Sequence, residues 1–167
     1  RAIRARILGT VTNRAIAHAR LRASRLVADG GLPALATPAD VVRWFGAVQS
    51  QDVPGALWAL AQRLPAGTSA DDLEGVFDRG EIVRTHVMRP TWHFLAPEDL
   101  RWMEGLTGPR VQRQNASLQR RLGIPDEAFD RAIEVFTDVM RGGRSLTRAE
   151  LRRCLSDAGV DVADPFA

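Results

Sequence analysis

Residues 82–95, with the sequence IVRTHVMRPTWHFL, carry the one clear strand signal in this chain. Two runs rich in β-branched and aromatic residues, IVRTHV and TWHFL, flank a short turn that contains Pro90. Residues of these types favour strands, and a short turn between two such runs is typical of a hairpin. The stretch therefore predicts a β-hairpin, and the patterns on either side of it are helical.

Alternation along a strand sends successive side chains to opposite faces, so the residues of the hairpin can be assigned to faces. Trp92 and Phe94 are expected on one face and His93 on the other. Arg84 and His86 share a face of the partner strand. His93 is therefore a candidate functional residue, although a structural histidine bonded to a backbone carbonyl would fit the same position.

Helical patterns with start and stop signals surround the hairpin. Thr37 and Pro38 illustrate a start signal, because they supply a capping hydroxyl and a proline at the first helical position. The expected helices cover residues 12–27, 38–48, 54–64, 70–79, 97–102, 109–122, 126–141 and 148–158.

The order of these elements predicts the fold class and the domains. Helices, a hairpin and then more helices are typical of a helix-turn-helix with a wing, followed by the start of a second copy. We therefore expect a mainly α protein with a small β-hairpin, built as a tandem winged helix-turn-helix. Residues 1–108 would form the first unit with the N-terminal helix and the wing hairpin, and 109–167 a connecting helix and the start of a truncated second unit.

The second unit is inferred from element order, because no clear sequence repeat accompanies it. Its first helix has an apolar stripe at helical spacing, which is typical of a buried face. The stripe consists of Phe129, Ile133, Phe136 and Met140. The chain starts at Arg1 without a methionine and ends soon after a helical pattern, so we expect it to be part of a longer protein.

The composition is typical of a globular protein without a metal site. The 167 residues are 45% apolar, which is enough to bury a core. No apolar run approaches the roughly 20 residues that a membrane span needs, and the charged first residues do not suit a signal peptide. One cysteine, Cys154, and three histidines do not suit a zinc site. We expect no metal, no cofactor, no membrane partner, and a cytoplasmic, nucleoid-associated location.

The basic residues are all arginines, and they are clustered. Seven arginines precede the first acid, Asp29, and a second acid-free stretch, 105–125, carries four more. Such clusters suit a polyanion, although arginines that only solvate helix faces are the alternative. Arg89 lies at the predicted tip of the wing, where it would meet a phosphate backbone. The candidate contacts to such a polyanion are Arg14, Arg20, Arg84, Arg89, His93, Arg110 and Arg113.

Two glutamines, Gln49 and Gln51, flank Ser50 where the helix at 38–48 is expected to end. Amides do not titrate near neutral pH, so each side chain can only accept through oxygen and donate through nitrogen. An extended backbone after the helix would send both side chains the same way, where they could orient one water molecule. The alternative is that they cap exposed carbonyls of the preceding helix.

Three segments resemble the AlkZ/YcaQ-type family, the bacterial winged-helix DNA glycosylases. The first is TNRAIAHARL near the start, the second is AVQSQD with the following ALWALAQRL, and the third is VRTHVMRPTWHFLAPEDL. The second and third together are fairly specific, and the resemblance covers nearly all of this chain but only the N-terminal half of a typical member. Ser50 stands where an apolar residue is usual in the family, and Pro90 where a glycine is common.

The resemblance implies a DNA-repair glycosylase that hydrolyses the N-glycosidic bond of alkylated purines without a cofactor. A Gln-x-Gln motif is associated with this hydrolysis in the family, which would give Gln49 and Gln51 the catalytic role of positioning water. Some members act on interstrand crosslinks. The partner would then be damaged double-stranded DNA.

Two other functions fit the same sequence. A winged-helix regulator or inactive paralogue would bind DNA without catalysis, and Ser50 and Pro90 would then mark drift from the active pattern. A helical interaction domain would use its arginines only to solvate its surface, and it would show no salt-dependent affinity for DNA.

Overall fold

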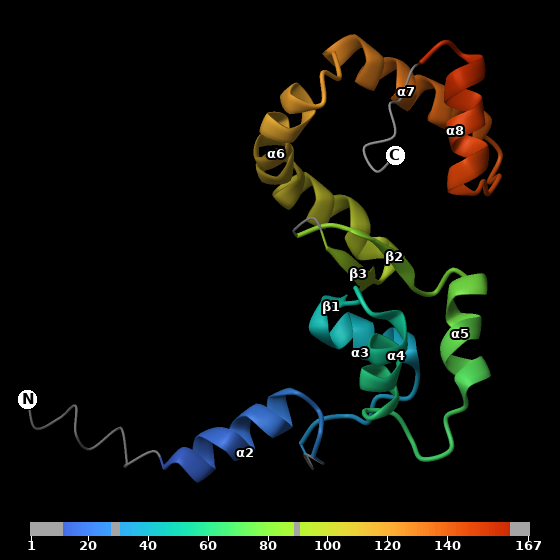
Figure 1. The fold of residues 1–167 in the computed structure, drawn as a ribbon. Helices are drawn as coiled ribbons and strands as arrows, with labels where there is room; N and C mark the ends of the chain where they lie inside the picture. Colours follow the sequence, from blue (N-terminus) through green and yellow to red (C-terminus); the bar gives the residue numbers. More distant parts are fainter. Residues whose placement is uncertain (1–11, 28–30, 89–90, 161–167) are drawn as a thin grey trace, which may run out of the picture. The chain divides into compact units, whose positions relative to one another are not determined.

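The computed structural model describes residues 12–27, 31–88 and 91–160. The chain divides into two compact units, Arg1–Gly108 and Pro109–Ala167. The helices shown in Figure 1 are α2 (Asn13–Ala23), α3 (Pro38–Phe45), α4 (Val53–Ala61), α5 (Ala70–Asp78), α6 (Pro97–Arg121), α7 (Asp126–Val139) and α8 (Arg148–Asp157). None of the described helices is long and apolar enough to cross a membrane.

Local capping chemistry explains where several helices begin. At the start of α3, the Thr37 hydroxyl accepts from the Asp40 backbone N–H at 3.2 Å, and the Asp40 carboxylate accepts from the Thr37 N–H at 2.9 Å. The same reciprocal pair opens α5 with Ser69 and Asp72. Each pair satisfies two backbone donors that would otherwise lack a partner. The hydrogen bond from Thr37 lowers the pKa of Asp40, because it favours the ionised carboxylate.

The predicted hairpin is confirmed, and it belongs to a sheet of three strands. Strands β2 (Val83–His86) and β3 (Trp92–Leu95) pair antiparallel, and a third strand, β1 (Ala47–Gln49), pairs antiparallel with the other side of β3. The order is β1-β3-β2 (Figure 1). One helix, one strand, two helices and a two-stranded hairpin, in that sequence order, give this unit a winged-helix-like fold.

The prediction of a helix through Val48 is wrong, because α3 ends at Phe45 and β1 follows directly. Gly46 has a φ of 72°, a conformation that glycine adopts without steric cost and that breaks the helix. A strand of three residues is too short to show a period in the sequence. It forms because β3 offers a partner from a distant part of the chain.

Strand β3 is buried on both faces, which places it at the centre of the first unit. Phe94 is fully buried with residues of α3, α4 and α5, and it contacts Phe77 at a ring separation of 5.1 Å. Leu95 points to the other face and packs with Met103 of α6 and with Val87. The predicted alternation along β3 is therefore confirmed, and each face of the sheet has its own apolar cluster.

The prediction of two helices between residues 97 and 122 is wrong, because α6 runs through both ranges and carries Pro109 in its interior. Proline cannot donate to the carbonyl four residues earlier, which belongs to Gly105. Both residues are exposed, so water can satisfy that carbonyl. The exposed position therefore lets the helix continue through the proline.

In the second unit, α7 and α8 pack through Val135, Leu155 and Val160. The prediction that the stripe of large apolar residues on α7 is buried is wrong for most of it, since Phe129 is 52% exposed and Ile133 is 50% exposed. The buried side of α7 instead centres on Val135, and Ala128, Ala132, Phe136 and Val139 pack against this cluster. Within residues 109–160 the structure contains helices but no strand, so the second winged helix stays a prediction.

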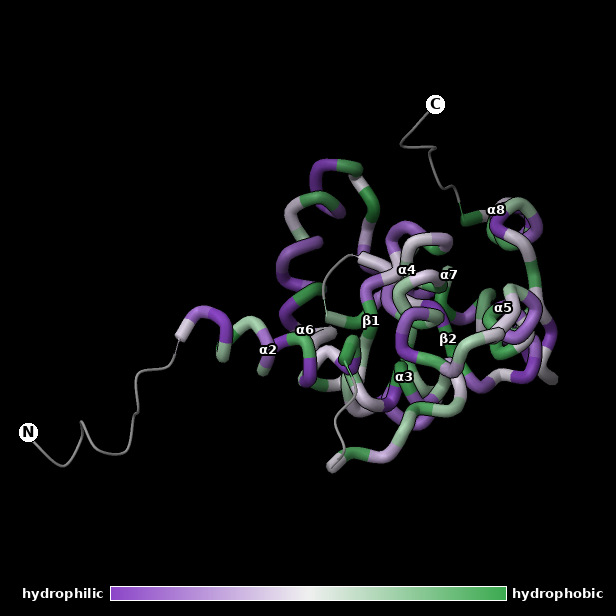
Figure 2. Tube along the Cα trace, turned by 90° about the horizontal axis from the view of Figure 1, so that it is seen from below, coloured by the Kyte–Doolittle hydropathy of each residue, from purple (hydrophilic) through white to green (hydrophobic). Residues whose placement is uncertain are grey.

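Helix α2 differs from the core helices, because none of its residues is buried. Figure 2 shows hydrophilic and hydrophobic residues interspersed along it. Its end is tied to the first unit by two hydrogen bonds. Trp44 Nε1 donates to the Ala23 carbonyl at 3.1 Å, and Arg63 Nε donates to the Ser24 carbonyl at 2.8 Å.

We expect Phe94→Ala to lower the free energy of unfolding by about 3–5 kcal/mol, because it removes a fully buried ring and leaves a cavity. Chemical denaturation of the purified protein measures this change. Phe129→Ala is the matched control, and it should cost less than about 1 kcal/mol since the ring is half exposed. Equal effects of the two substitutions would contradict the assignment of Phe94 to the core.

Candidate functional site

The segment Gln49–Gln51 lies at the edge of the sheet, with alternating exposure. Gln49 and Gln51 are exposed, whereas Ser50 between them is fully buried. In an extended segment this alternation directs both amides to the solvent side and the serine to the interior. Both glutamines are therefore accessible close to the start of α4, although regular strand structure ends at Gln49.

The two amides differ in their hydrogen bonds. Gln51 Oε1 accepts from the backbone N–H of Trp92 at 3.3 Å, which anchors it to β3. No hydrogen bond joins the Gln49 amide to another described residue, and Gln49 is the register partner of His93. An amide oxygen has two lone pairs and its nitrogen two donors, so Gln51 keeps both donors and one lone pair. Both side chains thus retain the capacity to bind water.

Ser50 is held from two sides. Its N–H donates to the Trp92 carbonyl at 2.8 Å. Its carbonyl accepts from Arg84 twice, from Nε at 3.2 Å and from Nη2 at 3.0 Å. The Ser50 hydroxyl is buried without a hydrogen-bond partner among the described residues. The backbone between the two glutamines is therefore fixed, whereas their side chains are exposed.

Arg84 belongs to a stack on one face of the hairpin. Its guanidinium lies 4.3 Å from the centre of the Trp92 ring. The Trp92 ring in turn meets His86 edge-on, at a centroid separation of 4.1 Å. The prediction that Arg84 and His86 share a face is confirmed by this register. The stack covers Arg84, which is half-buried, and directs it toward Ser50.

His93 lies in the middle of the sheet and is 2% exposed. Its Nδ1 lies 2.9 Å from the Thr91 carbonyl. Because a carbonyl can only accept, Nδ1 carries the proton in this bond. This contact corresponds to the structural histidine that the sequence left open, and a direct contact from His93 to DNA stays a prediction.

The other predicted DNA contacts lie on exposed helices or outside the described residues. Arg14 and Arg20 are exposed on α2, whose first turn contains no acid. Arg110 and Arg113 are exposed three residues apart on α6, in the second unit. Arg89 lies outside the described residues, so its predicted role at the wing is not tested. The structure groups Arg84 and His93 with the glutamines through the Ser50 carbonyl and the register of Gln49 on β3.

Helix α5 occupies the position of the recognition helix in a winged-helix-like unit, and it is acidic. Arg79, just after the helix, is bound to Glu81 at 2.6 Å, and this hydrogen bond lowers the pKa of Glu81. Carboxylates on this surface would repel the phosphates that line a DNA groove. The exposed acids of α5 are Asp71, Asp72, Glu74 and Asp78. The acids are visible in the sequence, but only the fold places this helix in the recognition position.

A cavity of about 240 Å³ adjoins Gln49, between α3, β1 and α4. Its walls are mainly apolar and include Phe45 and Val48. Arg63 lies at its edge, with its guanidinium 5.1 Å from the centre of the Phe45 ring. Burial lowers the pKa of Arg63. The cavity therefore places apolar surface beside Gln49, one of the two candidate catalytic residues.

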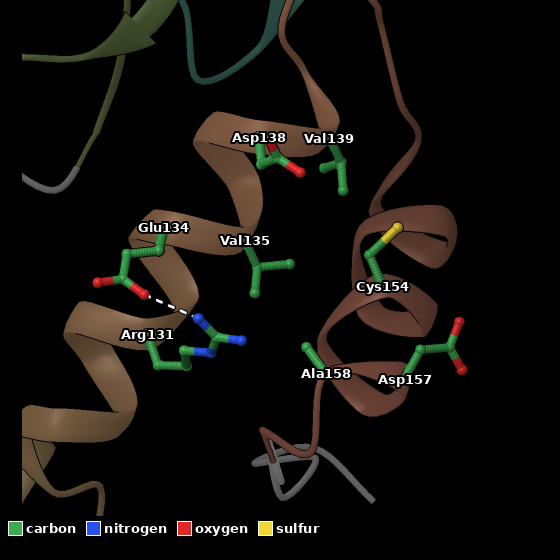
Figure 3. A pocket seen from close by; sticks show the side chains of 8 residues that line it. All are labelled: Arg131, Glu134, Val135, Asp138, Val139, Cys154, Asp157 and Ala158. Carbon is green, nitrogen blue, oxygen red and sulfur yellow. Dashed lines mark hydrogen bonds and ion pairs between the residues drawn. The ribbon is translucent and has the colours of Figure 1, made fainter.

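A larger cavity of about 510 Å³ lies between α7 and α8 (Figure 3). Its polar lining is mostly acidic, with Glu134, Asp138 and Asp157 around Cys154. The one arginine in it, Arg131, is bound to Glu134 at 2.9 Å. Negative charge disfavours a nucleic acid here. The described part of the chain also contains no group of three residues able to hold a metal ion.

Comparison with known protein families matches residues 42–164 to the family described as DNA glycosylase AlkZ-like. No curated protein and no solved structure shows a significant match to the chain. The matched range includes the glutamine segment and the hairpin, extends over parts of both units, and covers most of the sequence. The chain therefore belongs to the AlkZ-like DNA glycosylase family.

Proposed function

We propose that this protein hydrolyses the N-glycosidic bond of alkylated purines in double-stranded DNA, with Gln49 and Gln51 holding the attacking water. Membership of a DNA glycosylase family supports the reaction class. The observation that carries the site is the pair of exposed amides on either side of a buried serine whose backbone is held by β3 and Arg84. A fixed backbone with two accessible amides is suited to orienting one small molecule.

The reaction does not require a strong nucleophile. Alkylation at purine N7 makes the base cationic, so it leaves with the glycosidic electron pair and becomes neutral, while the sugar gains oxocarbenium character. Water then adds to the anomeric carbon and loses a proton to solvent. Amides are too weak to act as strong bases, so their contribution is orientation of the water. An uncharged pair also avoids repelling the cationic base.

Asp52 adds negative charge next to the amides. It occupies the N-cap position of α4, but its side chain makes no capping hydrogen bond there. Its carboxylate lies above Gly55, where a Cβ atom would come within 2.5 Å of Oδ2. A carboxylate at this place favours a developing positive charge on the sugar. Asp52 therefore supports the transition state electrostatically in this proposal.

Exposed arginines hold the duplex in this proposal, and α5 does not enter a groove. Arg14, Arg20, Arg110 and Arg113 are exposed and can contact phosphates. The carboxylates of α5 oppose insertion of that helix. Bulky adducts, including interstrand crosslinks, are awkward to extrude completely, so the lesion is attacked within the duplex. A complex with the damaged nucleotide swung fully into a closed pocket would contradict this.

The double substitution Gln49→Ala and Gln51→Ala should slow base release from a duplex containing N7-methylguanine by about 10²-fold or more, because the water loses its orientation. Single-turnover assays of the full protein measure this rate. Duplex affinity should stay within a factor of about two. Gln62→Ala, an exposed glutamine at the end of α4, is the control and should retain the rate. Unchanged release in the double variant would favour a DNA-binding protein without catalysis.

Replacing Arg14 and Arg20 with glutamine should weaken duplex binding and reduce its salt dependence. Each phosphate contact contributes about 0.9 to the slope of log affinity against log salt concentration, so loss of both contacts lowers the slope by about 2. Fluorescence anisotropy at several salt concentrations measures the slope. Arg79→Gln, which removes one positive charge, is the control, because Arg79 is already bound to Glu81. An equal loss of slope in both proteins would exclude specific contacts from α2.

A further inference from the structure

The hydrogen bonds around Ser50 depart from those of a regular antiparallel pair. In such a pair, two opposite residues exchange both of their N–H···O bonds. Ser50 donates to the Trp92 carbonyl at 2.8 Å, but the reciprocal bond from Trp92 to the Ser50 carbonyl is not formed. The Ser50 carbonyl instead accepts from Arg84, and the Trp92 N–H donates to Gln51 Oε1. One side-chain donor and one side-chain acceptor thus replace a single backbone bond.

We propose that Arg84 is a positioning residue that sets the orientation of Gln51 by occupying the Ser50 carbonyl. Because that carbonyl is taken, the Trp92 N–H is available to the Gln51 amide, which is then fixed with its two N–H donors toward solvent. Without Arg84, the Ser50 carbonyl can pair with Trp92, and Gln51 loses its anchor. The inference rests on the proposed function only for its effect on the rate.

The contacts of Arg84 require an arginine. Nε and Nη2 both reach the Ser50 carbonyl, at 3.2 and 3.0 Å, and the flat guanidinium stacks on the Trp92 ring. A lysine has one compact ammonium group. It cannot place two N–H donors in the same geometry, and it is not planar, so it cannot stack on the ring as a guanidinium does. The charge is the same in both residues. Arg84→Lys therefore separates the geometry of the guanidinium from its charge.

A phosphate contact is the competing role for Arg84, and the two roles predict different measurements. For a positioning residue, Arg84→Lys lowers the single-turnover rate of base release about 10-fold or more, because a displaced catalytic group loses its alignment. Arg84→Gln then leaves the salt slope of duplex binding unchanged. For a phosphate contact, Arg84→Lys keeps the rate, and Arg84→Gln lowers the slope by about 1. Arg43→Lys, on an arginine bound to Glu98, is the control that should match the unsubstituted protein.

Amide hydrogen exchange tests the same arrangement without DNA and with Arg84 in place. In Gln51→Ala the Trp92 amide loses its acceptor, so its exchange should accelerate at least 10-fold if Arg84 keeps the Ser50 carbonyl occupied. Persistent protection of the Trp92 amide would show that the carbonyl returns to β3, and it would overturn the proposal. Absence of base release by the unsubstituted protein would defeat the proposed function instead, and the exchange result would still decide the role of Arg84.

Discussion

The structure of the first unit depends on the pairing of a short edge strand with β3. Strand β1 has three residues, which is too few to be stable alone, and it gains its place from the register of Ala47, Val48 and Gln49 on β3. The bond from Ser50 to Trp92 extends this pairing by one residue. It also brings the glutamine segment to the start of α4. Loss of the pairing would therefore release the candidate catalytic amides together with the end of α3.

Strand β3 contributes both to the apolar core and to the candidate site. Phe94 and Leu95 of β3 anchor the two apolar clusters of the unit, while Trp92 provides both backbone bonds that hold Ser50 and Gln51. A rigid support of this kind restricts the glutamine backbone, so little conformational freedom is lost when a water molecule binds. Of the two exposed amides, Gln51 is anchored to β3, and the Gln49 amide makes no hydrogen bond to another described residue. The site is thus placed at the boundary between a packed core and solvent.

The described helices differ in the charge of their exposed side chains. Helix α5 carries carboxylates where a winged helix usually reads a DNA groove, whereas α2 and the acid-free part of α6 expose arginines. A regulator that reads base sequence through its recognition helix would need the opposite arrangement on α5. The charges therefore favour binding through the phosphate backbone, which suits a protein that must find damage in any sequence context.

The sequence by itself determined the features that depend on neighbouring residues. Local chemistry determines three such features, which could be identified from the sequence. They are the hairpin at 83–95, the caps at Thr37 and Ser69, and the glutamine pair. Only the tertiary structure decided that α3 stops at Phe45, that Ser50 is buried, and that Arg84 reaches a carbonyl 34 residues away. It also decided that α7 buries Val135 and exposes Phe129. These outcomes depend on which distant surface packs against each segment. The periodicity of apolar residues along the sequence does not identify that surface.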